Sequence, residues 1–377
     1  MAGHDRRFDG VRRYGDHPQC RKAPPVISHL TATGDIVLTK SLAEVPAAPG
    51  FTALQEVLGA SSCVLSSVEL PFSDRGHPSD RILNFRARPE LVHELAAFNL
   101  KVATLANNHS SDYGWDALDD TVRRLRSVGV TAIGAGEDLA AAEEAAVLEI
   151  AGRRVGILAW SCLLPLGAAA GPSKPGISPV HVETEWVVNG EFQLEEPGVP
   201  PVIRTRVRAA DHERVIGRVR EVRERVDVVV VTVHWGFGFG SARAEYQRVF
   251  GHALVDAGAD IVLGHHVHAP QGVEVYRDRV IVYSPGNFVA QQPRENITPE
   301  IEEIYDAFSR DAFITVVDLA GGDVPQVSLV PIMTADHGLP VLADPENARR
   351  IADRLAVESA DLDTVVAFDG ARVTVTG

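Results

Sequence analysis

Short apolar runs alternate with amphipathic stretches along most of the chain, and this alternation predicts strands separated by helices. The runs that predict buried strands are 26–39, 62–69, 102–106, 155–161, 227–233 and 260–263. Apolar residues at helical spacing predict helices at 51–60, 88–98, 115–128, 211–225 and 244–258. The later chain differs, with antiparallel strands predicted at 273–282 and 313–319 and a closing helix at 345–355. This order predicts an α/β sandwich with mixed sheets.

One long segment interrupts the alternation. Residues 163–208 are rich in Gly, Pro and scattered polar residues, which predicts a long loop excursion over the scaffold. Functional residues favour loops carried on a rigid scaffold, so we expect this excursion to lie near the functional site. We further expect a flexible N-terminal arm at 1–25, one domain at 26–335 that includes the excursion, and an extension at 336–377 packed on that domain.

Composition and charge exclude several classes of protein. The net charge of −15 argues against a nucleic-acid partner, because phosphate binding requires a basic surface. The three cysteines, Cys20, Cys63 and Cys162, are widely spaced, which fits a reducing compartment better than a disulfide framework. Residues 1–22 are polar and basic without an apolar run, so we expect neither a signal peptide nor a membrane anchor, and a cytoplasmic location.

Side chains able to bind metals stand where predicted strands give way to loops. The segments are Thr33-Gly34-Asp35, Val68-Glu69-Leu70-Pro71, Asn107-Asn108-His109, Val233-His234-Trp235-Gly236 and Gly264-His265-His266-Val267-His268. Because the carboxyl ends of parallel strands face one crevice, these side chains are expected to converge. Carboxylate and amide oxygens with imidazole nitrogens suit Zn, Mn, Fe or Ni.

Each segment alone has an ordinary structural explanation. Asp35 after glycine could form a turn, Glu69 could end a strand, and His234 could be a core histidine with satisfied hydrogen bonds. The cluster at 265–268 is the strongest signal, since three imidazoles within four residues have little structural purpose. If this segment is extended, His266 and His268 point to the same side. The coincidence of all five segments favours a metal site.

Longer motifs around these residues resemble a known family. They are GDIVL at 34–38, VELP at 68–71, the segment 85–136 containing ANNHSSDYG, HWG at 234–236, GADIVLGHHVH at 258–268 and YSPGNF at 283–288. Together they resemble the capsule poly-γ-glutamate synthesis proteins of the CapA type, a branch of the calcineurin-like metallophosphoesterase superfamily. The resemblance implies a four-layer α-β-β-α sandwich with two mixed sheets and a metal site at the sheet ends.

The resemblance also assigns roles to residues. It implies one or two divalent ions (Mn, Zn or Fe) held by Asp35, Glu69, Asn108, His234, His266 and His268. Within that set Glu69 takes the bridging position, and His266 and His268 are divided between the ions. His109 matches the position of a general acid or transition-state stabiliser. Substrate contacts are expected from Asn107, Asp112, Trp235, His265 and Asn287.

Two residues depart from the pattern of the wider superfamily. Val37 stands where metallophosphoesterases have a histidine ligand, which leaves one metal position short of protein ligands. A single ion, or a second ion held largely by water, is therefore an alternative to a full two-ion centre. Gly238 stands where the family tends to have a glutamate, and Glu245 is a candidate to compensate.

These observations predict a metal-dependent hydrolase or transferase. The expected reaction centre is a phosphoester or a γ-glutamyl amide, in poly-γ-glutamate or related biosynthesis, with a small-molecule or polyanionic substrate and with neither nucleic acid nor membrane as partner. The alternative is a non-catalytic, metal-stabilised subunit that binds a polyanionic polymer or a partner. His109 discriminates between them, because a purely structural metal site has no use for an imidazole at that position.

Overall fold

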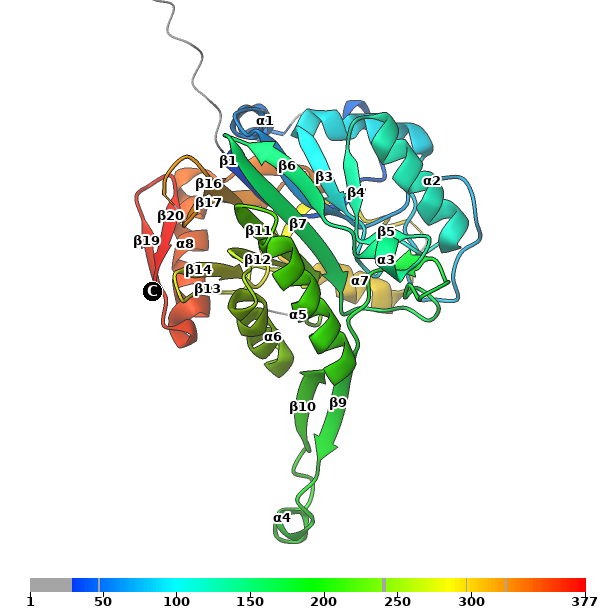
Figure 1. The fold of residues 1–377 in the computed structure, drawn as a ribbon, viewed down its shortest axis with the longest axis vertical. Coiled ribbons are helices and arrows are strands. Elements are labelled where there is room, and N and C mark those ends of the chain that lie inside the picture. The colour runs from blue at the N-terminus through cyan, green and yellow to red at the C-terminus, as the bar shows by residue number, and fades with distance from the viewer. Residues whose placement is uncertain (1–28, 47, 239–241, 296, 323) are drawn as a thin grey trace, which may run out of the picture.

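Two large β-sheets form the centre of the molecule (Figure 1). The computed structural model describes residues 29–46, 48–238, 242–295, 297–322 and 324–377. The predicted arm at 1–25 and Cys20 lie outside the described residues.

The larger sheet has ten strands in the order β19-β20-β17-β16-β1-β2-β3-β4, with β15 also paired to β1 and β18 to β17. Its strands are β1 (His29–Val37), β2 (Cys63–Val68), β3 (Leu100–Thr104), β4 (Thr131–Ile133), β15 (Asn287–Ala290), β16 (Asp311–Asp318), β17 (Gln326–Thr334), β18 (Pro340–Leu342), β19 (Val365–Phe368) and β20 (Val373–Thr376). β1 to β4 pair in parallel, whereas β16 to β20 pair antiparallel, so the sheet is mixed.

The smaller sheet has six strands in the order β13-β14-β12-β11-β7-β6. They are β6 (Ala146–Ile150), β7 (Arg153–Ser161), β11 (Val228–His234), β12 (Ile261–His265), β13 (Val273–Tyr276) and β14 (Arg279–Val282). The four central strands pair in parallel and the two edge strands pair antiparallel. The run predicted as one strand at 273–282 is two strands, because Arg277 and Asp278 take positive φ and turn the chain.

Alternation along the strands separates the core into layers. In β11, Val228 and Val230 pack into the core between the sheets, while Val229 and Val231 face helices on the outside. These outer helices are α5 (Ala209–Arg223) and α6 (Glu245–Asp256). The outer face of the larger sheet is covered by α1 (Phe51–Gly59), the 3₁₀ helix η2 (Pro89–Phe98) and α2 (Gly114–Ser127). The predicted four-layer α-β-β-α sandwich with two mixed sheets is therefore confirmed.

The remaining elements are short or lie at the edges. They are η1 (Leu42–Glu44), β5 (Ala135–Gly136), α3 (Leu139–Ala142), β8 (Gly176–Ile177), β9 (Val182–Val187), α4 (Gly190–Glu195), β10 (Val202–Val207), α7 (Pro299–Asp306), η3 (Asp336–Gly338), α8 (Pro345–Ser359) and η4 (Ala360–Leu362). Beyond residue 336, β18 and β20 pair with β17, so this part of the chain extends the larger sheet. None of the helices that the structure describes is both long and apolar enough to span a bilayer.

Candidate metal centre

The two sheets bring their polar strand ends together. Asp35 lies near the end of β1, and Glu69 directly follows β2. From the smaller sheet, His234 is the last residue of β11, and the histidine cluster begins at His265, the last residue of β12. Asn108 lies in the loop after β3. The parallel strands predicted from the apolar runs thus deliver these residues to one place.

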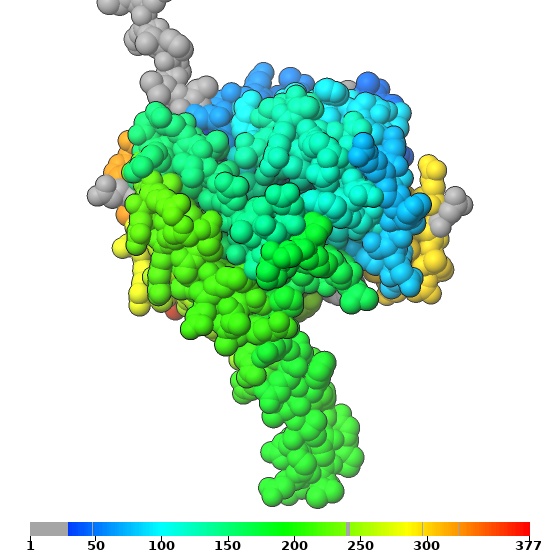
Figure 2. Space-filling view, turned by 45° about the vertical axis from the view of Figure 1, so that its right-hand side comes forward, coloured from blue at the N-terminus to red at the C-terminus, as the bar shows by residue number. Residues whose placement is uncertain are grey.

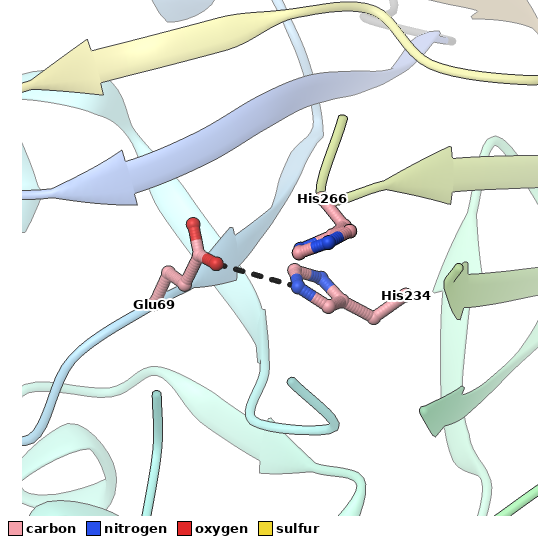
Figure 3. A group of neighbouring side chains, drawn as sticks. All are labelled: Glu69, His234 and His266. Atoms are coloured by element: carbon pink, nitrogen blue, oxygen red, sulfur yellow. Dashed lines mark ion pairs between the residues drawn. The ribbon is translucent and has the colours of Figure 1, made fainter. Parts of the chain in front are cut away.

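The donor atoms form two groups that share Glu69. One group is Glu69, His234 and His266, and the other is Asp35, Glu69 and His268, with the ligand atoms of each group within 4.8 Å of one another. In the first group His234 Nε2 lies 3.3 Å from Glu69 Oε1 (Figure 3). The same nitrogen lies 2.7 Å from Asn108 Oδ1.

His268 approaches both carboxylates of the second group. Its Nε2 lies 3.9 Å from Glu69 Oε2, and its Nδ1 lies 3.9 Å from Asp35 Oδ2. Glu69 is thus common to both donor groups. Among the described residues, all six side chains implied as ligands by the motifs therefore gather in one cluster.

Unsatisfied buried atoms test whether these residues suit a cation. Asp35 Oδ1, both carboxylate oxygens of Glu69, His234 Nδ1 and His266 Nδ1 are buried without a hydrogen-bond partner. Buried polar atoms left unpaired are costly, and they are rare in folded proteins. Oxygen and imidazole nitrogen are also the ligands preferred by Zn, Mn and Fe. The residues present fit one or two divalent cations.

Burial sets the protonation of the cluster. Burial acts to raise the pKa of Asp35, but His265 and two further imidazoles outweigh it and hold that pKa well below its usual range. Burial, aided by the charge of Asp35, raises the pKa of Glu69 to about 7. Burial lowers the pKa of His234 to about 3 and that of His266 well below its ordinary value. These two imidazoles are thus neutral at pH 7, the form that binds metals.

His109 stands beside the cluster but belongs to neither donor group. Its Nδ1 donates a hydrogen bond of 2.7 Å to Asp112 Oδ2, and its ring packs on Phe85 with 4.3 Å between centroids. Asp112 is fully buried and accepts further hydrogen bonds from Arg81 Nη1 at 2.6 Å and from the Phe85 amide at 2.7 Å. Because Nδ1 carries the proton shared with Asp112, Nε2 is the nitrogen left for other chemistry.

The sequence profile of the family described as Bacterial capsule synthesis protein PGA_cap matches residues 29–292. The chain belongs to the PGA_cap family. The family resemblance predicted from the motifs is thereby confirmed.

Curated relatives of this PGA_cap chain are similar over most of its length. A probable polyglutamine synthesis accessory protein of Mycobacterium tuberculosis is 30% identical over 282 residues, which is 72% of this chain and 66% of the relative. The PGA biosynthesis protein CapA of Bacillus subtilis is 29% identical over 69% of this chain and 62% of its own length. The match thus spans less than two thirds of these relatives.

Solved structures give weaker similarity. A hypothetical protein from Thermus thermophilus aligns with a TM-score of 0.44 at 16% identity, over 80% of this chain and 98% of that one. The NAD nucleotidase of Haemophilus influenzae aligns with a TM-score of 0.38 at 10% identity, over 88% of this chain and 62% of its own. Likenesses at this level add nothing about activity.

In the structure, four of the residues expected to contact substrate make hydrogen bonds within the protein. Asn107 is fully buried: its amide donates to Val68 O, and its oxygen accepts from the backbone amides of His109 and Ser110. It therefore shapes the loop that carries Asn108. Trp235 is also fully buried and donates to Tyr283 O. Neither side chain has a polar atom left for a ligand.

Asp112 and Asn287 each orient a histidine of the centre. Asp112 is buried and satisfied by the bonds that hold His109 in place. Asn287 Oδ1 accepts from His268 Nδ1 at 2.8 Å, which leaves His268 Nε2 directed at Glu69. Hydrogen bonds of this kind fix the tautomer and orientation of a ligating imidazole.

His265 lies beside the Asp35 carboxylate. Its Nδ1 is 3.4 Å from Asp35 Oδ1, but neither of its ring nitrogens makes a hydrogen bond in the described structure. The motifs assigned this histidine to substrate, whereas the geometry makes it a neighbour of the Asp35 carboxylate and only 2% of its side chain is exposed.

The segment after β12 is not extended, although the prediction that His266 and His268 point to the same side assumed an extended segment. His266 and His268 have φ of 93° and 57°, in the left-handed region. Both imidazoles still reach the cluster, with 5.9 Å between their centroids. The predicted common direction is therefore correct, and the reason given for it is wrong.

Glu245 does not compensate for Gly238. Its carboxylate pairs with Arg204 Nη1 at 3.3 Å and accepts from the Thr205 amide at 3.2 Å. A side chain at Gly238 would instead stand near the centre, since an added Cβ would lie 3.7 Å from His266 Nε2. The glycine keeps this approach to His266 open.

The excursion at 163–208 is not one irregular loop. Its first part stays on the body, where residues 176–179 are buried and Ser178 N donates to Gly134 O. Its second part forms the antiparallel pair β9–β10, which projects away from the body (Figure 1). The prediction that the whole excursion lines the site is therefore wrong for residues 182–207.

Residues missed by the motif analysis also shape the centre. Arg81 holds both Asp112 and the carbonyl of Asn108, and Phe308 packs on His268 with 4.3 Å between centroids. Phe308 and Asn287 also line a cavity of about 510 Å³ beside the centre. A single arginine or phenylalanine in a loop carries no spacing signal that sequence inspection could use.

Proposed function

We propose that this PGA_cap chain is a cytoplasmic metal-dependent hydrolase or transferase in poly-γ-glutamate or related biosynthesis. The supporting observation is the pair of donor groups that share Glu69, with the His109–Asp112 pair beside them. A cation bound there supplies Lewis-acid activation of a phosphoester or γ-glutamyl amide.

The chain's own residues complete the chemistry. Asp112 holds the His109 ring through the Nδ1 proton, so that the imidazolium form can deliver its Nε2 proton to a leaving group and become the neutral ring. Asn287 fixes His268, and Arg81 fixes Asp112, so the imidazoles need little rearrangement during turnover. The relatives named for polyglutamate and polyglutamine synthesis are longer than the matched region, so the pathway is part of the proposal.

The test is turnover by the full chain after loading with Mn²⁺, Zn²⁺ or Fe²⁺. We expect cleavage of a chromogenic phosphodiester or of a γ-glutamyl anilide, and its loss in Glu69→Gln, which removes the shared carboxylate charge. His93→Ala, at an exposed imidazole that belongs to neither donor group, serves as the control. Metal-loaded protein that cleaves neither substrate nor poly-γ-glutamate would contradict the proposal.

A non-catalytic metal site is the second candidate, and burial favours it. Asp35, Glu69 and His234 are almost wholly buried. Such burial is expected of a site whose cation only joins the two sheets. If the metal is structural, its binding should raise the stability of the fold. No metal-loaded form should then cleave the phosphodiester, the γ-glutamyl anilide or poly-γ-glutamate.

A further inference from the structure

A cavity of about 510 Å³ adjoins the metal centre beside β15 and α7. Asn287, which orients His268, and Phe308, which packs on the same imidazole, both line it. Gln291 directly follows β15 and lines the cavity about 13 Å along the chain from Asn287. A ligand in the cavity would therefore extend away from whatever bond reacts at the centre.

Gln291 has a buried amide nitrogen without a hydrogen-bond partner. Its Oε1 accepts from the backbone amides of Thr39 at 3.0 Å and Lys40 at 2.9 Å, so the oxygen and nitrogen of this side chain cannot be interchanged. Nε2 has two protons to donate and no acceptor among the described residues. Gln291 is 5% exposed, and a donor left unpaired at such burial is costly. An acceptor oxygen of a ligand in the cavity would satisfy it.

Two further lining residues have unsatisfied polar atoms. Gln292 Nε2 and Thr334 Oγ1 are buried, and within the part of the chain that the structure describes neither has a hydrogen-bond partner. Such groups are rare in folded proteins, so their gathering around one cavity indicates a ligand. Because an amide nitrogen only donates, both glutamines require acceptor atoms from that ligand.

The charge of the lining contrasts with that of the chain. The net charge of the chain is −15, yet three permanent cations and only two carboxylates line the cavity. Arg294 and Arg310 each pair with a carboxylate at 2.9 Å. The Lys40 ammonium also lines the cavity but makes no ion pair with any described residue. This cation is left for an anionic ligand.

An aromatic wall and a helix end favour a carboxylate over a phosphate. The rings of Tyr305 and Phe308 lie 5.9 Å apart between centroids, and both line the cavity, where they suit the methylene groups of a ligand. Both residues stand at the C-terminal end of α7, where the helix dipole is negative. This end opposes a dianionic phosphate more strongly than a singly charged carboxylate.

We propose that the cavity binds a carboxylate carried on a short aliphatic chain, in the part of the substrate beyond the reacting bond. Gln291 Nε2 and the Lys40 ammonium donate to the carboxylate, and the aromatic wall covers the methylene groups. Each unit of a γ-glutamyl chain offers this combination. The assignment to substrate rests on the proposed function, which places the reaction at the neighbouring centre. The β9–β10 arm contributes no lining residue and projects from the body apart from the gold segment around α7 (Figure 2).

The test is calorimetric titration of tri-γ-glutamate into the full chain with a chelator present. The chelator prevents turnover and removes metal as a second site for carboxylates. We expect saturable binding to the wild type. Gln291→Glu keeps an oxygen for the Thr39 and Lys40 amides but replaces the donor by a charged oxygen, so binding should weaken by about 100-fold or more. Lys40→Gln removes an exposed charge and should weaken binding about threefold, and less at high salt.

A change of ligand separates recognition from loss of structure. The wild type should prefer tri-γ-glutamate to the same peptide with its carboxylates amidated. Gln291→Glu should instead prefer the amidated peptide, whose NH₂ groups can donate to the new carboxylate. Lys101→Gln, at an exposed lysine near the start of β3 that does not line the cavity, is the matched control and should change nothing. If Gln291→Glu does not fold, Lys40→Gln and the preference of the wild type decide.

Three results would overturn the carboxylate site. The wild type does not distinguish the two peptides, or neither cavity variant weakens binding of tri-γ-glutamate. In the third, tripolyphosphate binds as tightly as tri-γ-glutamate and loses as much in Gln291→Glu, which makes the site one for phosphate. Turnover by the metal-loaded chain tests the proposed function separately. Cleavage without the expected binding pattern refutes the carboxylate site alone, whereas the expected binding without cleavage refutes only the hydrolase or transferase.

Discussion

Two histidines of the centre hold backbone conformations that disfavour most side chains. His266 and His268 lie in the left-handed region, which costs non-glycine residues of order 1–3 kcal/mol each. Neighbours enforce both: the His266 amide donates to Asp35 Oδ2 at 3.1 Å, and the Ser309 amide donates to His268 O at 3.0 Å. The carboxylate of Asp35 thus shapes the histidine loop as well as offering a ligand.

His109 allows chemistry to be separated from metal binding. His109→Ala should keep the metal, because His109 is in neither donor group, yet lose about 10²–10⁴-fold in turnover if its proton is needed. Metal content, melting temperature and rate are measured on one preparation. Unchanged turnover would remove His109 from the mechanism, and a loss confined to stability would show that it only packs on Phe85.

Glu69 should make metal binding depend on pH. In the metal-free protein its pKa is about 7, so below pH 7 an incoming cation must displace a proton. Affinity should fall by up to about tenfold per pH unit below 7 and level off above about pH 8. His234 adds nothing to this slope near neutrality, because its pKa is lowered to about 3. Competition with a chelator across this range measures the effect, and Glu69→Gln should bind weakly with a flat profile.

At the scale of elements, the apolar runs predicted the central strands, and the polar residues at the ends of these runs predicted the site. The runs at 62–69 and 155–161 are β2 and β7, and the polar residues that follow strands do converge. Periodicity could not reveal which polar neighbours are ligands. Asn107 and Asn108 look alike in periodicity, but in the fold Asn107 accepts from amides of its own loop and Asn108 faces His234.

The elements missed by the sequence are strands with few buried residues. β9 and β10 are short, mostly exposed strands, so they lack the apolar run that marks a buried strand. β20 likewise has one buried residue among four and gains its identity by pairing with β17 and β19.

Close approach of β1 to the turn before β15 depends on Gly34. A Cβ there would lie 1.9 Å from the carbonyl oxygen of Gly286. Gly34→Ala should therefore lower the free energy of unfolding by about 3 kcal/mol or more and displace the adjacent Asp35 from the centre. Urea unfolding and metal content measure both effects.

Gly217 provides the matched control for this substitution. It lies in α5, and an added Cβ there meets nothing within 4 Å. Gly217→Ala should raise stability by about 0.5–1 kcal/mol and leave the metal in place. If both alanine variants behaved alike, the close approach at Gly34 would not matter.

For the whole molecule, the centre is a junction between the sheets. Asp35, Glu69 and Asn108 come from the larger sheet, whereas His234 and the 265–268 cluster come from the smaller one. A cation held by both groups would join the two halves of the sandwich through direct bonds. Neither sheet alone offers a full set of ligands.

Removing the metal should therefore destabilise the entire fold. A ligand bound only to the folded state, at about 1,000 times its dissociation constant, contributes ~4 kcal/mol. Chelation should accordingly lower the melting temperature by several degrees, and re-addition should restore it. Glu69→Gln serves as the control and should show no such shift. If the melting temperature of the metal-loaded wild type does not change when the chelator is added, the metal does not join the two sheets.

The order of strands in the larger sheet also constrains when the centre can be made during synthesis. β1 lies between β2 on one side and β15 with β16 on the other, and the latter strands are reached only at residues 287–318. Chains emerge from the ribosome N-terminal end first. On one side, β1, which carries Asp35, therefore lacks its partner strands until some 250 further residues are translated. The centre cannot be loaded by a half-made chain. A cation that binds here would therefore be taken up after the histidine loop has been translated, since each donor group includes a residue of that loop.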